Sequence, residues 1–455
     1  MRWAESESLI RSTGDQSSYY RVKPTFQPDY AEVHRNLGTT FVAQGRLDEA
    51  VLYYQWALAL QPDNTETYLK LGLAFMLQGR LDQAVASYER AVALQPGNAE
   101  AHLILASGLR QQGRLDEAVL ACRSAVALRP DDAVAHVFLS SLLLTQGRFH
   151  EGWQELEWRL EWNERNIPQT LWQGEDLSGR TLLIWAEQGF GDSIQFARYV
   201  NMVMTPGRRI LVEVEKPLLK LFQDSFGVDG VFSREQERPH FDFHIPFVSL
   251  PQRMGTDLNT IPADIPYLRA DPSLLQCWKQ RLDTFGGPKI GIVWAGSPEH
   301  RKDFARSIPF DVFRRALPVS GIDLFSLQVG PRASDRRASN DLKIEGISDH
   351  FADYADTAAA IRNLDLCVTV DTSVAHLAGA LGRPVWVLIP FLSDYRWLLY
   401  REDTSWYPSM RLFRQERLGD WGPVLDRVRA ELTRFAAGDQ SVLLPQVHRS
   451  SLAHA

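Results

Sequence analysis

A short stretch in the last third of the chain carries the residues best suited to chemistry. It reads DTSVAHLAGALG, and it begins at Asp371 directly after the apolar run LDLCVTV. The run predicts a buried strand, and the small residues predict a helix whose free N–H groups attract phosphate. Candidate ligand-binding residues are therefore Asp371, Thr372, Ser373 and His376. In the structural alternative, Asp371 only caps the helix and His376 only packs beneath it.

A glycine-containing loop is the second candidate. The segment TLLIWAEQGFGDSIQFARYV predicts a strand, a loop with Gly189 and Gly191, and an amphipathic helix. Glycine lets a ligand approach the backbone closely. Asp192 at the end of this loop is either the helix N-cap or a reactive carboxylate. The glycine spacing differs from the dinucleotide-binding motif, so NAD is not predicted.

A third polar group follows the predicted strand KIGIVW. Gly296 and Ser297 come directly after it, and the segment HRKDFARS adds a basic loop with Lys302 and Arg306. Such side chains bind phosphate oxygens, so the loop is a candidate diphosphate clamp, with a solvated run of charges as the alternative. Gln328 stands at the end of the next strand, DLFSLQVG. Further along, the aromatic-rich segment 393–415 offers Asp394 and Arg396 as candidate cleft residues.

The elements that must position these residues alternate between strand and helix. Short apolar strands recur between helices in two series, separated by a break around residues 271–288. This pattern predicts two α/β domains with parallel sheets, whose ligands bind beyond the carboxyl ends of the strands. We expect the first domain over residues 167–287 and the second over 288–437, where an amphipathic helix closes the fold.

The first part of the chain is a tandem repeat. The hexads GRLDEA, GRLDQA and GRLDEA begin at Gly45, Gly79 and Gly113, and GRFHEG follows at Gly147, a period of 34 residues. This period predicts stacked helix pairs over residues 31–166. Around them we expect a partial repeat or cap over 1–30 and a flexible tail over 438–455. The fourth repeat degenerates and gains Trp153, Trp158 and Trp162, which predicts a terminal helix covered by the next domain.

The composition argues against several classes of protein. The 455 residues carry a net charge of −7 and are 45% hydrophobic and 23% charged, which argues against a nucleic-acid partner. We expect no signal peptide and no transmembrane segment. Three scattered cysteines indicate a reducing compartment and no zinc site, so we expect a cytoplasmic protein without a metal. One sequence does not give the oligomeric state, and a homo-oligomer stays open.

Two resemblances follow from these motifs. The 34-residue repeats resemble the tetratricopeptide repeat (TPR) family. The motifs GFGD and DTSVAHLAGALG, within about residues 181–421, resemble the GT-B glycosyltransferases of the heptosyltransferase-like kind. Bacterial TPR proteins with such a C-terminal domain look most similar, and the O-linked N-acetylglucosamine transferases more distantly so. The implied fold is an all-α TPR solenoid followed by two Rossmann-like domains that face a cleft.

The resemblance also implies roles. Asp192 matches the general base toward the acceptor hydroxyl, and Arg306, or alternatively Lys302, matches the basic residue that faces the leaving diphosphate. The nucleotide-sugar loop and helix start match Asp371, Thr372, Ser373 and His376. The implied reaction is inverting, metal-independent transfer from a nucleotide-sugar donor, with no cofactor. The family carries Gly in place of Ser373, and KDFARS matches its lysine-centred loop only loosely, so the donor sugar is not specified.

The repeats point to the acceptor. Because a TPR solenoid takes an extended polypeptide, we expect a Ser or Thr hydroxyl of a recruited protein, with flagellin or another surface protein as candidate by family likeness. One alternative is a TPR scaffold whose GT-B domain is inactive. The other is a transferase acting on a lipid-linked or lipopolysaccharide acceptor, for which only RRILVEVEKPLLK offers a basic patch, and that segment also fits an ordinary strand and helix.

Overall fold

The computed structural model describes residues 27–445, with gaps at 163–164, 166, 301–302 and 339–341. Residues 1–26 of the predicted cap, residues 446–455 of the predicted tail, and Lys302 therefore lie outside the described residues. The chain divides into two compact units between Leu139 and Ser140. This division falls within helix α8 (Ala133–Thr145).

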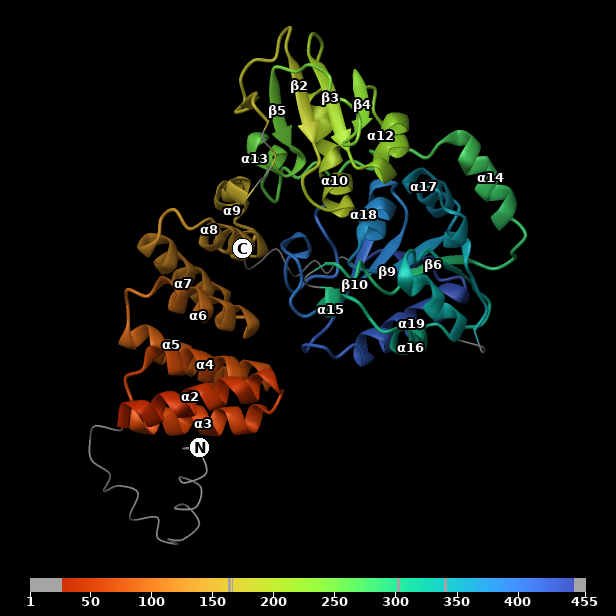
Figure 1. The fold of residues 1–455 in the computed structure, drawn as a ribbon. Coiled ribbons are helices and arrows are strands. Elements are labelled where there is room, and N and C mark those ends of the chain that lie inside the picture. The colour runs from red at the N-terminus through yellow and green to blue at the C-terminus, as the bar shows by residue number, and fades with distance from the viewer. Residues whose placement is uncertain (1–26, 163–164, 166, 301–302, 339–341, 446–455) are drawn as a thin grey trace, which may run out of the picture. The chain divides into compact units, whose positions relative to one another are not determined.

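The first unit consists of antiparallel helix pairs stacked one on the next (Figure 1). Its helices before α8 are α2 (Gln27–Ala43), α3 (Leu47–Leu60), α4 (Thr65–Leu77), α5 (Leu81–Leu94), α6 (Ala99–Gln111) and α7 (Leu115–Leu128). The pairing confirms the predicted tandem helix pairs.

The repeated residues explain why these helices form and pack. The turn within each pair holds a glycine at positive φ, from 73° at Gly45 to 78° at Gly113, where other residues would be strained. Asn64 caps α4 by accepting a hydrogen bond from the N–H of Thr67. Neighbouring repeats are also joined by side chains, since Gln78 donates to Asp48 over 2.7 Å and Gln112 donates to Asp82 over 2.8 Å.

The second unit holds a first parallel sheet in the order β1-β5-β2-β3-β4. Its strands are β1 (Thr170–Leu171), β2 (Thr181–Trp185), β3 (Arg209–Val214), β4 (Gly230–Ser233) and β5 (Phe243–Pro246). The helices of this half are α10 (Phe190–Phe196), α11 (Val200–Val203), α12 (Leu219–Ser225) and α13 (Leu250–Arg253). The segment RRILVEVEKPLLK forms β3 and the start of the following helix, and residues 210–214 are buried.

A second parallel sheet follows, in the order β11-β10-β9-β6-β7-β8. Its strands are β6 (Lys289–Val293), β7 (Asp323–Ser326), β8 (Ile344–Glu345), β9 (Leu366–Val370), β10 (Val385–Ile389) and β11 (Met410–Arg414). Its helices are α14 (Pro272–Leu282), α15 (Asp303–Arg306), α16 (Phe310–Phe313), α17 (Tyr354–Arg362), α18 (Ser373–Ala380) and α19 (Gly422–Ala436). The two sheets confirm the predicted pair of Rossmann-like domains.

The strand order determines where a ligand fits. In the second sheet the chain starts at β6, adds β7 and β8 on one side, and returns to add β9, β10 and β11 on the other. The order therefore reverses between β6 and β9, and open α/β sheets bind ligands beyond the strand ends at such a point. In the first sheet the reversal lies between β2 and β5.

Two expectations about the ends of this unit have different outcomes. In GT-B proteins a closing helix crosses back to the first half, but α19 packs its buried face, including Leu425, Val428 and Leu432, into the core of the second sheet. The expectation of a covered terminal helix holds at Trp153 in α9 (Phe149–Leu156), because its indole N–H donates to the Thr256 carbonyl over 3.0 Å. Trp162, by contrast, is 51% exposed.

We expect Gly72→Ala to destabilise the repeat unit. A Cβ at this position would lie 2.3 Å from the Tyr88 ring, and overpacking a buried contact costs about 1–3 kcal/mol, more than the helix propensity that alanine adds. Urea unfolding followed by helical circular dichroism measures the change. Gly97→Ala is the matched control, because nothing lies within 4 Å of its added Cβ. Equal stability of the two variants would contradict this packing role.

Candidate functional site

Arg306 joins the two strand ends at the reversal point of the second sheet. Its Nη1 donates to the Asp371 carbonyl, which follows β9, over 3.1 Å. Its Nη2 lies against Gly296, which follows β6, where an added Cβ would approach to 2.5 Å. A larger residue here would therefore require the Arg306 side chain to move. The structure thus places three of the predicted site residues, Arg306, Gly296 and Asp371, at one point.

A small hydrogen-bonded group holds this loop in place. The Gly296 N–H donates to Ser307 Oγ over 2.9 Å, and Ser307 Oγ donates to the buried Asp303 carboxylate over 2.7 Å. Gln328 accepts from the N–H of Ala295 over 3.0 Å and donates to the Val329 carbonyl over 3.2 Å. Its amide therefore bonds the end of β6, whereas Ser297 is exposed.

The start of α18 has its N-cap at Thr372, one residue after Asp371. Thr372 Oγ1 bonds Thr369 and makes no capping bond, so the first N–H groups of the helix receive no acceptor from it. Ser373 Oγ bonds the hydroxyl of Tyr354 over 2.7 Å. Asp371 is therefore not the cap that the structural alternative assumed.

His376 is held from two sides within this unit. Its Nδ1 bonds the Tyr407 hydroxyl over 3.0 Å, and its ring stacks on Trp397 with centroids 5.4 Å apart. Burial lowers the pKa of His376 well below its ordinary value, and the nearby cation Arg396 lowers it further. The imidazole is therefore neutral at physiological pH. The opposite edge of the ring faces Gly191, where an added Cβ would lie 3.0 Å from Cδ2.

The start of α10 thereby reaches the second half, and α10 packs directly on α18. Gly191 and Asp192 lie in this helix and not in the predicted loop. Gly189, not Asp192, is the N-cap of α10, and the Asp192 carboxylate accepts from the Gly189 N–H over 3.2 Å. Its other oxygen pairs with the Arg396 guanidinium. Burial raises the pKa of Asp192, Arg396 opposes this rise, and Asp394 reinforces it.

The Arg396 side chain contacts polar groups of both α/β halves. It follows β10, donates to Gln195 on α10, pairs with Asp192, and lies 3.0 Å from Asp394. Burial also raises the pKa of Asp371, with Asp394 adding to the rise and Arg396 and Arg306 opposing it. The sequence offered Arg396 only as a cleft candidate. Its place beside Asp394 in the segment between two apolar strands was the signal that could have raised its rank.

Sequence reasoning missed the group at the reversal point of the first sheet. Arg159 donates to Glu187, after β2, over 2.6 Å and to Ser249, after β5, over 2.8 Å. It therefore fills the position where a ligand of this sheet would bind. The available signal was that Arg159 replaces a small residue of the repeat pattern. The group also fixes the beginning of the loop that leads to Asp192.

In the described part of the chain, no group of three or more His, Cys, Asp or Glu side chains is arranged to hold a metal ion. No helix among the described residues is both long enough and apolar enough to cross a membrane.

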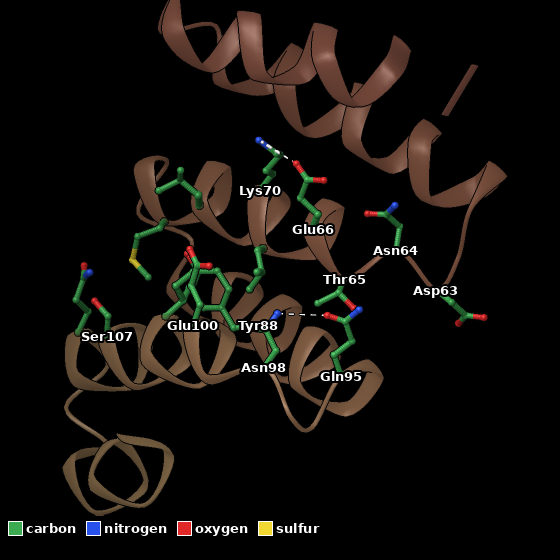
Figure 2. A pocket seen from close by; sticks show the side chains of 15 residues that line it. Asp63, Asn64, Thr65, Glu66, Lys70, Tyr88, Gln95, Asn98, Glu100 and Ser107 are labelled. Carbon is green, nitrogen blue, oxygen red and sulfur yellow. Dashed lines mark hydrogen bonds and ion pairs between the residues drawn. The ribbon is translucent and has the colours of Figure 1, made fainter. Parts of the chain in front are cut away.

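A second candidate site lies in the repeat unit. A pocket of about 760 Å³ is lined by α4, α6 and the turns beside them (Figure 2). Its lining includes the carboxylates of Asp63, Glu66 and Glu100 and a single cation, Lys70. Glu66 pairs with Lys70 over 3.5 Å and with Arg35 over 3.6 Å, and Asp63 pairs with Arg90 over 3.7 Å. Apolar lining comes from Leu69, Leu73, Met76 and Ile104. The pocket is therefore an acidic, partly apolar surface.

Comparison with known proteins identifies the repeats of the first part of the chain. The Tetratricopeptide repeat family model matches residues 23–65, 35–99, 69–133 and 105–151. The chain is thus a protein of N-terminal tetratricopeptide repeats followed by two parallel α/β sheets. It is similar to Protein FlbA of Caulobacter vibrioides, with 29% identity over 317 residues that cover 63% of this chain and 53% of FlbA. The chain therefore spans about half the length of this relative.

Solved structures also resemble part of the chain. A crystal structure of MamA is 27% identical, with a TM-score of 0.28, and the match covers 29% of this chain and 73% of MamA. YrrB, described as a TPR protein with an unusual peptide-binding site, is 20% identical, with a TM-score of 0.26, and the match covers 28% of this chain and 66% of YrrB.

We expect Arg396→Gln to be strongly destabilising at neutral pH. Removing one partner of an ion pair leaves the other charge uncompensated, which costs up to about 3–5 kcal/mol for a fully buried pair and less for Arg396 and Asp192, whose side chains are 13% and 18% exposed. Burial already raises the pKa of Asp192 in the folded state, and loss of the cation raises it further. The folded variant then binds a proton more tightly than the unfolded chain, so the deficit shrinks as the pH falls below that folded-state pKa.

Urea unfolding at pH 7 and pH 5 measures this dependence. Arg180→Gln is the control, because Arg180 pairs with Asp242 over 3.2 Å but is 60% exposed, and such pairs contribute about 0–1 kcal/mol. A deficit for Arg396→Gln that grows toward acidic pH would show that Asp192 is not the group left unpaired.

Proposed function

We propose that this protein is a cytoplasmic, metal-independent, inverting glycosyltransferase that moves a sugar from a nucleotide-sugar donor to a Ser or Thr hydroxyl of a polypeptide. One observation carries the proposal. The carboxylate of Asp192, from the first α/β half, pairs with Arg396 of the second half, and its helix α10 packs on α18, which begins after β9 at the reversal point of the second sheet. Acceptor activation and donor binding would then take place at one site.

The donor is assigned to the second sheet. A nucleoside diphosphate needs donors for its phosphate oxygens, and the start of α18 and the Arg306 guanidinium supply them. Gly296 lets the guanidinium lie against the backbone. As the glycosidic bond to the diphosphate breaks, negative charge gathers on the leaving oxygens, and these groups stabilise it without a metal. Lys302 remains a second candidate for this role.

The acceptor is assigned to the loop of the first half. In an inverting displacement the acceptor oxygen attacks the anomeric carbon and loses its proton to a base, while the diphosphate leaves from the opposite face. Asp192 is the base in this proposal, and a positioned base contributes about 10²–10⁴-fold to the rate. Arg396 orients the carboxylate and favours its ionised form. The neutral His376 beside Gly191 contributes a polar contact to the sugar or acceptor.

The repeat unit is assigned to acceptor recruitment. Its pocket combines three carboxylates, one cation and apolar side chains, so it favours a polypeptide with basic and apolar residues. A lipid acceptor receives no support from RRILVEVEKPLLK, because residues 210–214 of this segment form a buried strand. The scaffold alternative differs only in lacking turnover, so the experiment on Asp192 also tests it.

We expect Asp192→Asn to lower the transfer rate by about 10²–10⁴-fold while nucleotide binding persists, since the amide keeps the shape of the side chain but cannot accept the proton. Release of nucleoside diphosphate from UDP-, GDP-, ADP- and CMP-linked sugars in the presence of acceptor protein measures the rate. Asp176→Asn is the control, because its carboxylate bonds only Ser178 in an exposed turn. Full turnover by Asp192→Asn would remove the assigned base, and nucleotide binding without wild-type turnover would favour the scaffold.

We expect reversal of the pocket charge to weaken binding of the acceptor without changing turnover of the donor. The double variant Glu66→Lys, Glu100→Lys should raise KM for a basic polypeptide acceptor about tenfold or more, because opposite charges become like charges. Donor hydrolysis without acceptor should not change. Glu89→Lys is the control, since Glu89 lies on α5 outside the pocket lining and is 52% exposed. An unchanged KM for the double variant would place acceptor recruitment elsewhere.

A further inference from the structure

A second arginine lies on the far side of the carboxylate that contacts Arg306. Asp303 is 3% exposed, and its Oδ1 lies 3.5 Å from Arg306 Nε. Its Oδ2 lies 2.7 Å from Nη1 of Arg332, which follows β7. The same Nη1 donates to Ser307 Oγ over 3.0 Å. One carboxylate thus holds two guanidiniums, one on each oxygen.

Both arginines keep donors to spare. Arg306 makes one hydrogen bond, through Nη1, and Arg332 makes one, through its own Nη1, among the described residues. The other N–H groups of the two guanidiniums bond no described side chain or carbonyl. Arg306 also interacts electrostatically with the Asp371 carboxylate, so two carboxylates face the two cations. The pair still presents unused N–H donors, among them the buried Nε–H of Arg306, and such donors suit a polyanion with several oxygens.

The element that carries Arg332 is held by two side-chain contacts beyond Arg332. It is the 3-10 helix η8 (Pro331–Ala338), where Asp335 accepts from the Trp294 indole at the end of β6 over 3.3 Å. Arg336 of the same helix pairs with Asp349 over 2.5 Å. Arg332 is thus presented by a held segment, and its side chain remains 32% exposed. A preorganised guanidinium loses little freedom when it binds an anion.

We propose that Arg332 and Arg306, bridged by Asp303, form a two-arginine diphosphate site at the reversal point of the second sheet. The inference rests on the proposed function for its ligand, the diphosphate of the donor. It adds Arg332 as a binding residue. It also adds Asp303 as the positioning residue that sets the spacing of the two guanidinium groups. Each guanidinium can bond two oxygens of one phosphate group. No covalent step is assigned to either arginine.

Titration calorimetry of the full chain with inorganic pyrophosphate tests the site without knowledge of the nucleobase. The wild type is expected to bind, and Arg332→Ala is expected to weaken the affinity at least tenfold. Arg332→Lys should fall between them, because it keeps the charge but loses the fork. Arg337→Ala is the matched control, since Arg337 lies on the same helix, is 73% exposed, and lies near Asp349. Its affinity should equal that of the wild type.

A second variant distinguishes anion binding by Arg332 from a purely structural role of this residue. If Arg332 only neutralised buried Asp303, the double variant Asp303→Asn, Arg332→Ala would fold stably and bind pyrophosphate as the wild type does, and that result overturns the inference. Our inference predicts a folded double variant with weak binding. A wild type that binds no pyrophosphate also overturns it. Arg332-dependent pyrophosphate binding without any donor turnover would instead retain the anion site and reject the proposed transferase.

Discussion

A partly buried cation, Arg396, links the two α/β halves beside the packing of α10 on α18. Arg396 leaves the end of β10 in the second half and reaches Asp192 and Gln195 on the first helix of the other half. A guanidinium removed from water is unfavourable unless its donors are paired, and an isolated buried carboxylate is unfavourable for the same reason. Each half therefore supplies what the other requires. The polar contact fixes the place of α10 on α18 more specifically than apolar packing could.

The same interaction affects the chemistry that the site can perform. Burial raises the pKa of Asp192 and Asp371 and lowers that of His376, while the arginines oppose the first two shifts and add to the third. The result is two carboxyl groups and one neutral imidazole close to several permanent cations. Such divergent environments let similar side chains take different roles in one site.

The sequence predicted the elements of this fold well because their signals are local. Glycines at a 34-residue period fix the turns of the repeats, and the apolar run before Asp371 predicts β9 without reference to any other strand. The pairing of Asp192 with Arg396 was not predictable in this way, because 204 residues separate the partners. Gln328 shows that a local signal can also suggest a contact that the fold does not use. Its place after a strand suggested a ligand contact, but its amide bonds the backbone of the neighbouring strand.

Where a residue departs from a family pattern, the sequence shows the departure, but only the folded structure shows what the residue does. Arg159 replaces a small repeat residue, and only the fold shows that its guanidinium occupies the strand ends of the first sheet. The closing helix α19 has the amphipathic pattern of its counterpart in GT-B proteins, yet its apolar face belongs to the second core. Amphipathicity fixes that a helix must cover an apolar surface, but it does not determine which one.

The side-chain hydrogen bonds between repeats have a consequence for how the number of repeats can evolve. Gln78 reaches Asp48, and Gln112 reaches Asp82, so the module that contains Gln78 and Asp82 offers an aspartate to its successor and a glutamine to its predecessor. A duplicated 34-residue module would find both partners already in place. The array can thus be lengthened or shortened by whole modules without new interfaces, and its reach can evolve independently of the chemistry that follows it.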